Sequence, residues 1–505
     1  MNEKIKKLIK CIIPVCASWI KKNDDDGMVR FIDPNDDEEI SAHYGATHAA
    51  AAFIIWGKTI NDDTIYQQGV DLLHSILRRW NHSKTLPAFH YDFNNFAISI
   101  LEPFVDKETA KLIKDVVCHT EDSNHDTINW LPMRWLVNCK RMEWTNDRKY
   151  ENNIVCCQKK ITDATNADGG IEDRLPHGMS FNLQYDLATV AILQYLRVHG
   201  EAIDLSKELG FLLDAVAPDG DINYQGRGTN QIFAWGLWIY LLASSCQITA
   251  LTDALNFLET RIQKMLDHNN MMLNGWNGSE KYLWWDYHYT SVYTAHCLLW
   301  LVLAFVDKDK KVIHPDKSAH DATGLHIHRS KNFFTSLFDG RTEYVAEKGP
   351  SIAAIWSKSQ GMICKGVFAP WQGAFGNKYI YEDVVLKNYC GLLEIKRNKD
   401  WSKNRYVHKL LPHFETKASC KVKPLFCPIN VFEKNNALEL TWYNSTPLEV
   451  IFNLPAIIEE CKVELFADGI RVPLLCNSAI KNQYGWVFLY QSRKVKAKII
   501  KLIVR

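Results

Sequence analysis

The chain has 505 residues, of which 47% are hydrophobic and 23% are charged, and this composition is typical of a globular protein and excludes a disordered or collagen-like chain. Lys and Arg number 59 and Asp and Glu number 58, so the formal net charge of +1 gives no overall attraction to nucleic acid or to an anionic membrane. The sequence therefore predicts no nucleic-acid partner, and any acidic ligand must be bound by local groups.

The chain begins with a segment, residues 1–22, in which lysines flank a short apolar stretch. Pro14 interrupts that stretch, and Lys21 and Lys22 follow it where a signal peptide would have small residues, so an amphipathic helix is the preferred interpretation. No stretch of the sequence reaches the roughly 20 apolar residues of a membrane-spanning helix. The sequence therefore predicts no membrane span.

The 14 cysteines are scattered through predicted helices and strands and form no CxxC pair. This pattern is typical of reduced, buried side chains and argues against a disulfide framework or a zinc site. With no convincing signal peptide, it favours a cytoplasmic location, although secretion or a periplasmic location stays open. No metal site and no cofactor are predicted, and a structural divalent cation is left open.

Helical spacing dominates residues 1–306. The segment 64–80, for example, places its apolar side chains on one stripe of a helix. Short clusters of polar and aromatic residues open several such helices, at intervals of about 38 to 59 residues, close to the periods of helical repeat arrays. The clusters lie at residues 43–45, 90–92, 128–130, 181–185, 228–231 and 287–289.

Each interval leaves room for a helical hairpin, and the predicted helix over 232–243 is apolar nearly all round, as expected for a helix buried between others. Inner helices surrounded by amphipathic outer helices form an (α/α) toroid, here predicted as an incomplete barrel of helical hairpins. Such a ring would collect the helix starts on one rim, where Trp, Tyr, His and Asn side chains suit a chain of sugars. Helix capping and core packing explain any single cluster as well.

Strand patterns dominate the last part of the chain. Apolar and polar residues alternate over 438–442, and Asp468 and Gly469 separate two short strand-like segments as in a β-hairpin. The charged segment 307–311 opens a linker that is predicted to extend over 307–330. The sequence therefore predicts a multidomain chain, with the toroid over 1–306 and a β-rich domain over 331–505.

Two segments of the helical half carry the strongest functional signal. Residues 166–186 include Asn182 at the predicted start of an inner helix, and residues 217–231 form a glycine-rich loop that contains Tyr224 and Arg227. The Asn precedes the Tyr by about 40 residues, in a helical toroid followed by a β-rich domain. In these features the chain resembles the polysaccharide lyases of the chondroitin/hyaluronan and heparinase II/III types.

The resemblance implies an antiparallel β-sandwich for the C-terminal domain and an enzyme that cleaves a uronic-acid-containing polysaccharide by β-elimination. Asn182 takes the position of the residue that neutralises the uronate carboxylate, and Tyr224 falls in the catalytic loop. The loop lacks the His found in that family, so the general base is left open among His177, His288 and the segment 326–328.

β-Elimination begins with removal of the C5 proton beside the uronate carboxylate, which requires neutralisation of that charge and stabilisation of the enolate. Asn182 and Arg227 could donate hydrogen bonds there. A phenol such as Tyr224, with a usual pKa of about 10, can act as the base if nearby cations lower the pKa. A loop anchor explains Tyr224 equally well, and an ion pair with Asp219 or Asp221 explains Arg227.

The segment 284–289 contains six consecutive aromatic or ionisable residues, and one helix face cannot bury them all. Some of these side chains are therefore expected to contact an acidic polysaccharide or oligosaccharide. The predicted substrate-binding residues are Trp276, Trp284, Trp285, Tyr287, Tyr185, Asn230, His90 and Trp130.

Three other functions remain open at this point. A glycoside hydrolase on the same toroid would use two carboxylates, and several lie near the repeat junctions. A uronate C5-epimerase would remove the same proton as a lyase, and a noncatalytic glycan-binding protein would use the aromatic side chains alone. The candidate carboxylates are Asp92, Asp126, Asp168, Asp186 and Asp286. The sequence predicts neither the particular glycan nor the oligomeric state.

Overall fold

The chain divides into two compact units, one formed by Met1–Thr323 with Asn482–Gly485 and the other by Gly324–Lys481 with Trp486–Arg505. The computed structural model describes residues 1–34, 37–41, 43–83, 90–175, 178–226, 231–267, 289–317, 322–339, 351–365, 390–397, 420–425, 428–482 and 485–505. Each unit is considered by itself below.

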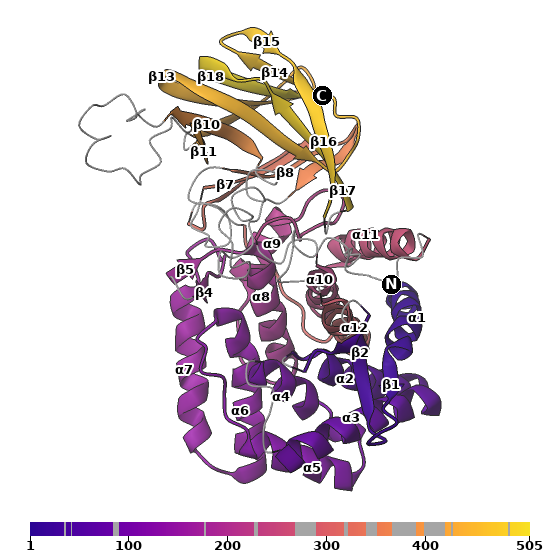
Figure 1. Ribbon diagram of the computed structural model, residues 1–505. Coiled ribbons are helices and arrows are strands. Elements are labelled where there is room, and N and C mark those ends of the chain that lie inside the picture. The colour runs from indigo at the N-terminus through magenta and orange to yellow at the C-terminus, as the bar shows by residue number, and fades with distance from the viewer. Residues whose placement is uncertain are drawn as a thin grey trace, which may run out of the picture. The chain divides into compact units, whose positions relative to one another are not determined.

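In the described residues of the first unit, helices alternate along the chain between an inner and an outer position (Figure 1). The inner helices are α2 (Gly45–Ile60), α4 (Tyr91–Ser99), α6 (Leu131–Thr145), α8 (Leu183–Val198), α10 (Ile232–Ser244) and α12 (Thr290–Val306). Each inner helix contacts the next, and α12 contacts α2, so the inner helices form a closed ring. The sequence predicts an incomplete barrel, whereas in the structure the contact between α12 and α2 closes the ring.

Every inner helix has an outer helix packed against it. The outer helices are α1 (Asn2–Ser18), α3 (Asp63–Ser83), α5 (Lys107–His119), α7 (Lys149–Ala164), α9 (Ser206–Ala215) and α11 (Ile248–Asp267). The sequence explains which helix takes which position. All residues of α10 are buried, whereas α5 buries only Thr109, Ile113 and Val117, one stripe of an amphipathic helix.

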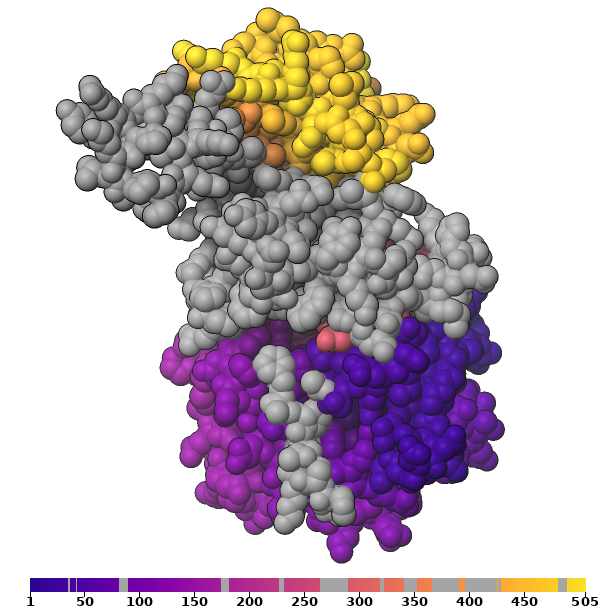
Figure 2. Space-filling view, in the orientation of Figure 1, coloured from indigo at the N-terminus to yellow at the C-terminus, as the bar shows by residue number. Residues whose placement is uncertain are grey.

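The N-terminal helix α1 is amphipathic, as the sequence indicates. It buries Ile5, Leu8 and Ile12 on the side that packs against α12, while its lysines are largely exposed. The N-terminal part of the first unit forms the surface that is drawn in indigo and purple in Figure 2. Within the described part of the chain, no helix has the length and apolar character needed to cross a membrane.

Short elements complete the first unit. They are strands β1 (Ile20–Lys22), β2 (Val29–Asp33), β3 (Glu38–Glu39), β4 (Asp173–Leu175) and β5 (Gly178–Ser180), and the single-turn helices Glu102–Phe104 and Ile128–Trp130. Residues 307–316, at the start of the predicted linker, are hydrogen-bonded to this unit. Asp309 N donates to Ala243 O at 3.0 Å and Asp316 N donates to Ser206 O at 2.9 Å. This stretch is therefore held against the ends of the helices.

The second unit is built from antiparallel strand pairs, which confirms the predicted β-rich domain. One sheet has the order β6-β7-β8-β9, with β6 (Leu325–Arg329), β7 (Phe333–Phe338), β8 (Ser351–Ser357) and β9 (Gly361–Lys365). The other sheet contains β10 (Gly391–Arg397), β11 (Cys420–Pro424), β12 (Ile429–Lys434), β13 (Ala437–Ala456), β14 (Val463–Ala467), β15 (Ile470–Val472), β16 (Leu474–Asn482), β17 (Gly485–Ser492) and β18 (Val495–Val504). The packing of the two sheets as a sandwich stays a prediction.

The long strand β13 is the centre of the second sheet, because β10, β12, β17 and β18 all pair with it. Its residues alternate between the two faces of the sheet. Leu438, Leu440 and Trp442 are fully buried, whereas Tyr443 is exposed, in agreement with the period-two pattern of the sequence.

Helices α2 and α3 cross at close range because glycines lie at the crossing. A Cβ atom at Gly69 would lie 2.8 Å from the backbone nitrogen of Ile54, and one at Gly57 would lie 2.5 Å from the backbone nitrogen of Tyr66. Both distances are shorter than a real Cβ contact allows. The close packing of α2 on α3 therefore depends on the absence of a side chain at Gly57 and Gly69.

We expect Gly69→Ala to lower the free energy of unfolding by about 1–2 kcal/mol, because the overpacking cost exceeds the gain in helix propensity. Urea unfolding followed by circular dichroism measures this change. Gln67→Ala, at an exposed position of the same helix, is the control and should change the free energy by no more than about 0.5 kcal/mol. Equal stabilities of the Gly69 variant and the wild type would contradict the close crossing.

Candidate functional site

Aromatic side chains at the starts of the inner helices contact one another at one end of the ring. Tyr44, which precedes α2, stacks on Phe93 of α4 with ring centroids 4.2 Å apart. His90, which precedes α4, lies 5.5 Å from Trp130, which precedes α6. We give the name rim cluster to ten of the ring side chains that contact one another at this end. Its members are His43, Tyr44, His48, His90, Phe93, Trp130, Phe233, Tyr289, Tyr293 and His296.

The remaining contacts extend the cluster around the ring. The ring of His43 lies 4.2 Å from that of His90 and 4.7 Å from that of Tyr289, which precedes α12. Phe233, in the first turn of α10, lies 5.5 Å from Tyr293 of α12. Since these contacts join first-turn residues, α2, α4, α6, α10 and α12 all begin at the same end of the ring.

His296 lies in the middle of the rim cluster. Its ring centroid is 4.9 Å from His48 of α2, 6.0 Å from Phe93 of α4 and 5.5 Å from Phe233 of α10. Because it is on α12 and reaches three other helices, its side chain points toward the middle of the ring. Only 3% of His296 is exposed, and neither ring nitrogen has a hydrogen-bond partner among the described residues. Burial holds the pKa of His296 well below its ordinary value.

His48 is the neighbour of His296 in the middle of the cluster. Its Nδ1 lies 3.0 Å from the backbone carbonyl oxygen of Tyr44, and its Nε2 is buried with no hydrogen-bond partner in the residues that the structure describes. Burial lowers the pKa of His48 to about 3, although the bond to the Tyr44 carbonyl opposes that shift. Both central imidazoles are therefore neutral at pH 7.

The carboxylates near this end of the ring hold the helix starts. Asp33 accepts hydrogen bonds from the backbone nitrogen and the hydroxyl of Ser291, both at 2.7 Å, in the first turn of α12. Asp92 contacts Arg134 at 2.9 Å, and burial raises the pKa of Asp92. Asp186 accepts from the backbone nitrogen of Ile171, and burial raises the pKa of Asp186 well above its usual range.

Two further carboxylates named above as hydrolase candidates are also bonded. Asp168 accepts from the backbone nitrogens of Ala322 and Thr323, each at 3.1 Å. Asp126 is paired with Lys160 at 2.6 Å. Asp286 lies outside the described residues.

Asn182 lies at the start of α8 and contacts the loop that precedes α10. Gln225 of that loop accepts a hydrogen bond at 2.8 Å from the backbone nitrogen of Leu183, in the first turn of α8. The next loop residue, Gly226, has a φ of +104°, and a Cβ atom there would lie 2.7 Å from both Asn182 Oδ1 and Gln184 Oε1. The loop and the helix start are thus packed against each other through buried amide groups.

Tyr224 of the same loop is fully buried. Its hydroxyl donates a hydrogen bond at 2.6 Å to the carbonyl oxygen of Ala215 at the end of α9. This contact fits the loop-anchor interpretation of Tyr224, and its role as a catalytic base stays a prediction.

Of the other predicted site residues, the structure brings His90 and Trp130 together in the rim cluster and places Tyr185, also buried, in the first turn of α8. The predicted residues His177, Arg227, Asn230, Trp276, Trp284, Trp285, Tyr287 and His288 lie outside the described residues. The segment 326–328 lies in β6 of the second unit, where His326 bonds to Asp339 at 2.9 Å.

His48 and His296 were not among the predicted site residues, although the sequence carries a signal for both. His48 follows Tyr44 by four residues and His296 follows Tyr289 by seven, so each lies on the same helix face as an aromatic residue at the helix start. Applying the helical period inward from each opening cluster would have found them. As to metals, the described residues contain no group of three or more His, Cys, Asp or Glu side chains that could hold an ion.

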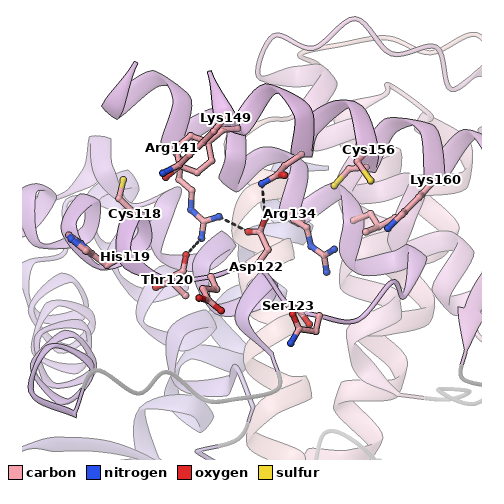
Figure 3. A pocket seen from close by; sticks show the side chains of 16 residues that line it. Cys118, His119, Thr120, Asp122, Ser123, Arg134, Arg141, Lys149, Cys156 and Lys160 are labelled. Atoms are coloured by element: carbon pink, nitrogen blue, oxygen red, sulfur yellow. Dashed lines mark hydrogen bonds and ion pairs between the residues drawn. The ribbon is translucent and has the colours of Figure 1, made fainter. Parts of the chain in front are cut away.

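A separate polar pocket of about 480 Å³ is lined by the end of α5, the following loop and helices α6 and α7 (Figure 3). Four Lys and Arg side chains line it, and each is paired with a carboxylate. The pairs are Arg134 with Asp92, Arg141 with Asp122, Lys149 with Asp147 and Lys160 with Asp126. Because these cations already have partners, the pocket gives no indication of the ligand that would occupy it.

Comparison with known proteins gives matches to solved structures alone. No family model matches the sequence, and no curated protein matches it. The Lin0763 protein from Listeria innocua matches with 15% identity over 60% of this chain and 97% of that protein, at a TM-score of 0.43. The α-1,6-mannanase GH76A from Salegentibacter sp. HEL1_6 matches with 13% identity over 60% of this chain and 99% of that protein, at a TM-score of 0.41.

An unsaturated glucuronyl hydrolase from Streptococcus agalactiae matches with 10% identity over 61% of this chain and 93% of that protein, also at a TM-score of 0.41. At these scores and identities, the matches assign neither a shared fold nor an activity to this chain. They also do not confirm the resemblance to polysaccharide lyases.

Because the two central histidines of the rim cluster are buried and neutral, we expect the free energy of unfolding to fall as the pH is lowered. The ordinary pKa of a histidine is 6.5, and the pKa of His48 in the folded chain is about 3, so below pH 6.5 the unfolded chain binds more protons than the folded chain. Between about pH 6 and pH 4, we expect each such histidine to lower the free energy of unfolding by about 1.4 kcal/mol per pH unit.

His48→Gln should remove one of these contributions. Its free energy of unfolding, measured in urea at several pH values, should therefore change less with pH than that of the wild type. Asp92 and Asp186, whose pKa values are raised, act in the opposite direction and are common to both proteins. Gln67→Ala, an exposed position without a titratable group, is the control and should keep the wild-type slope. The same slope in His48→Gln and in the wild type would contradict a neutral, buried His48.

We expect Gly226→Ala to be strongly destabilising, by about 2 kcal/mol or more, since it combines an unfavourable positive φ with displacement of the amides of Asn182 and Gln184. Thermal unfolding measures the loss. Gly200→Ala is a matched control, because Gly200 also has a positive φ, +123°, but no atom within 4 Å of the Cβ position. A loss no larger than that of Gly200→Ala would show that the close packing is unimportant.

Proposed function

We propose that the chain is an enzyme that cleaves glycosidic bonds in a polysaccharide and that the substrate binds at the rim cluster. The supporting observation is the convergence of aromatic rings and imidazoles from the starts of separate inner helices. Aromatic faces stack on the apolar faces of sugar rings, and imidazoles can donate, accept and transfer protons. The proposal treats the ring of helices as an (α/α) toroid of the kind that carbohydrate-active enzymes use, with the second unit as a β-sandwich.

For the chemical step, we propose β-elimination on a uronic-acid-containing polysaccharide. Each described carboxylate around the helix starts has at least one oxygen that accepts a hydrogen bond or pairs with a cation, although Oδ2 of Asp186 has no partner among the described residues. The rim cluster itself offers imidazole and phenol groups for proton transfer. Removal of the C5 proton needs such a base. We propose His90 for this role, because its ring contacts both the ring of Trp130 and the ring of His43. The buried amide of Asn182 is proposed as a donor to the uronate carboxylate.

Hydrolysis of the glycosidic bond is the second candidate, and Asp92 is the observation that favours it. This residue follows His90 by two positions in the first turn of α4, and burial raises the pKa of its carboxyl, as a general acid requires. Its contact with Arg134 would have to open during catalysis. A C5-epimerase would use the groups proposed for the lyase, without cleavage of the chain.

The activities give different products from the same assay. The full-length protein is incubated with a panel of neutral and uronate-containing glycans, and chain length and near-ultraviolet absorbance are followed. Shortened chains with the absorbance of a 4,5-unsaturated uronate support β-elimination, and shortened chains without it support hydrolysis. Solvent deuterium at C5 without cleavage supports epimerisation. Glycan binding with no product from any member of the panel would make the chain a binding protein and would refute the proposal.

We expect His90→Ala to lower kcat by about two to four orders of magnitude through loss of proton transfer, and Trp130→Ala to raise KM by roughly tenfold through loss of stacking. Steady-state kinetics on the active glycan measures both parameters. His74→Ala, in outer helix α3, is the control and should keep wild-type kinetics. Wild-type kcat in the His90 variant would remove His90 from the mechanism, and wild-type KM in the Trp130 variant would move the substrate away from the rim cluster.

A further inference from the structure

The two central histidines of the rim cluster carry buried ring nitrogens for which the described part of the chain provides no hydrogen-bond partner. These atoms are Nε2 of His48 and both ring nitrogens of His296. The two rings lie side by side, with centroids 4.9 Å apart. Buried polar atoms in native proteins almost always have partners, so three unsatisfied atoms in the middle of the ring point to a bound group.

The hydrogen-bonding capacity of the pair follows from its surroundings. A backbone carbonyl accepts only, so Nδ1 of His48 carries the hydrogen that is donated to Tyr44 O, and Nε2 of this neutral ring carries a lone pair. His296 is also neutral and therefore has one N–H and one lone pair. Together, the unsatisfied atoms offer one donor and two acceptors.

Hydroxyl groups match this capacity, because each hydroxyl both donates and accepts. A carboxylate or a phosphate has acceptors only and would face the lone pair of His48 with a second lone pair. It would also place a charge against the rings of Tyr44, Phe93 and Phe233, which contact the pair and carry no opposite charge.

We propose that His48 and His296 form a subsite for hydroxyl groups on an uncharged part of a sugar chain, with the aromatic rings of the rim cluster against the sugar faces. The inference rests on the proposed function, because it places one part of the same substrate. It adds that the two histidines do not bind the carboxylate of an acidic substrate, which is bound by other residues of the protein.

Nuclear magnetic resonance of the full-length protein labelled with ¹⁵N-histidine and ¹⁵N-tryptophan tests the subsite directly. The probes are neutral sugars (glucose, mannose, galactose, N-acetylglucosamine and their trisaccharides), and the comparators are glucuronate and galacturonate. His48→Gln and His296→Gln assign the imidazole resonances. We expect at least one neutral sugar to shift the resonances of His48 Nε2 and His296, and we expect the free uronates to shift them less.

Three results would overturn the subsite. If a neutral sugar shifts the indole signal of Trp130 but leaves both histidines unchanged, the subsite is wrong and the proposed function stands. If the uronates shift the histidines as strongly as the neutral sugars, the preference for hydroxyls is wrong. If no sugar shifts Trp130 or either histidine, the subsite and the proposed site both fail.

Variants of His296 separate binding from folding. We expect His296→Phe to bind the neutral sugar roughly tenfold more weakly than the wild type, because an aromatic ring of similar size offers no hydrogen bond. Its melting temperature should equal or exceed that of the wild type, since the change removes unsatisfied polar atoms from a buried position. His296→Gln should keep most of the affinity. His74→Phe, in α3, is the control for binding. Wild-type affinity in His296→Phe would overturn the subsite.

Discussion

A buried helix start leaves backbone N–H groups that need acceptors, and this constraint shapes the end of the ring where the inner helices begin. Asp33 supplies an acceptor to Ser291 of α12, and Gln225 supplies one to Leu183 of α8. Each acceptor comes from a segment far from the helix that it serves. The hairpins are therefore tied together at this end by side chain to backbone hydrogen bonds, in addition to apolar packing between the helices.

This use of the acidic side chains determines which chemistry remains in the middle of the ring. The acids described near the helix starts each accept at least one hydrogen bond or pair with a cation, and the side chains of the rim cluster that contact one another are aromatic or imidazole groups. An interior of that kind is neutral and of low dielectric constant. A charge that develops on a substrate there would have to be stabilised by oriented amides, such as those of Asn182 and Gln184, and not by a counter-ion.

The sequence predicts the inner helices well, because α10 and α12 are apolar on all sides and no outer position would suit them. It also indicates that the helix-opening clusters share one rim, and the contact between His90 and Trp130 agrees with this. The roles of individual residues are harder to predict from the sequence. Tyr224 bonds to Ala215, and this partner depends on how the loop folds back onto α9. His48 and His296 meet only because the ring closes between α2 and α12, which are separated by some 230 residues.

That closure has a consequence for the order of events during synthesis. Helix α2 packs against α12, and the N-terminal helix α1 packs against α12 and α11. The apolar faces of α1 and α2 are therefore covered only after α11 and α12 have been synthesised. Contacts of such high sequence separation slow folding, and a nascent chain that stops short of α12 exposes hydrophobic surface from both of its first two helices. Ribosome-bound fragments of this unit should accordingly need chaperones until α12 leaves the exit tunnel.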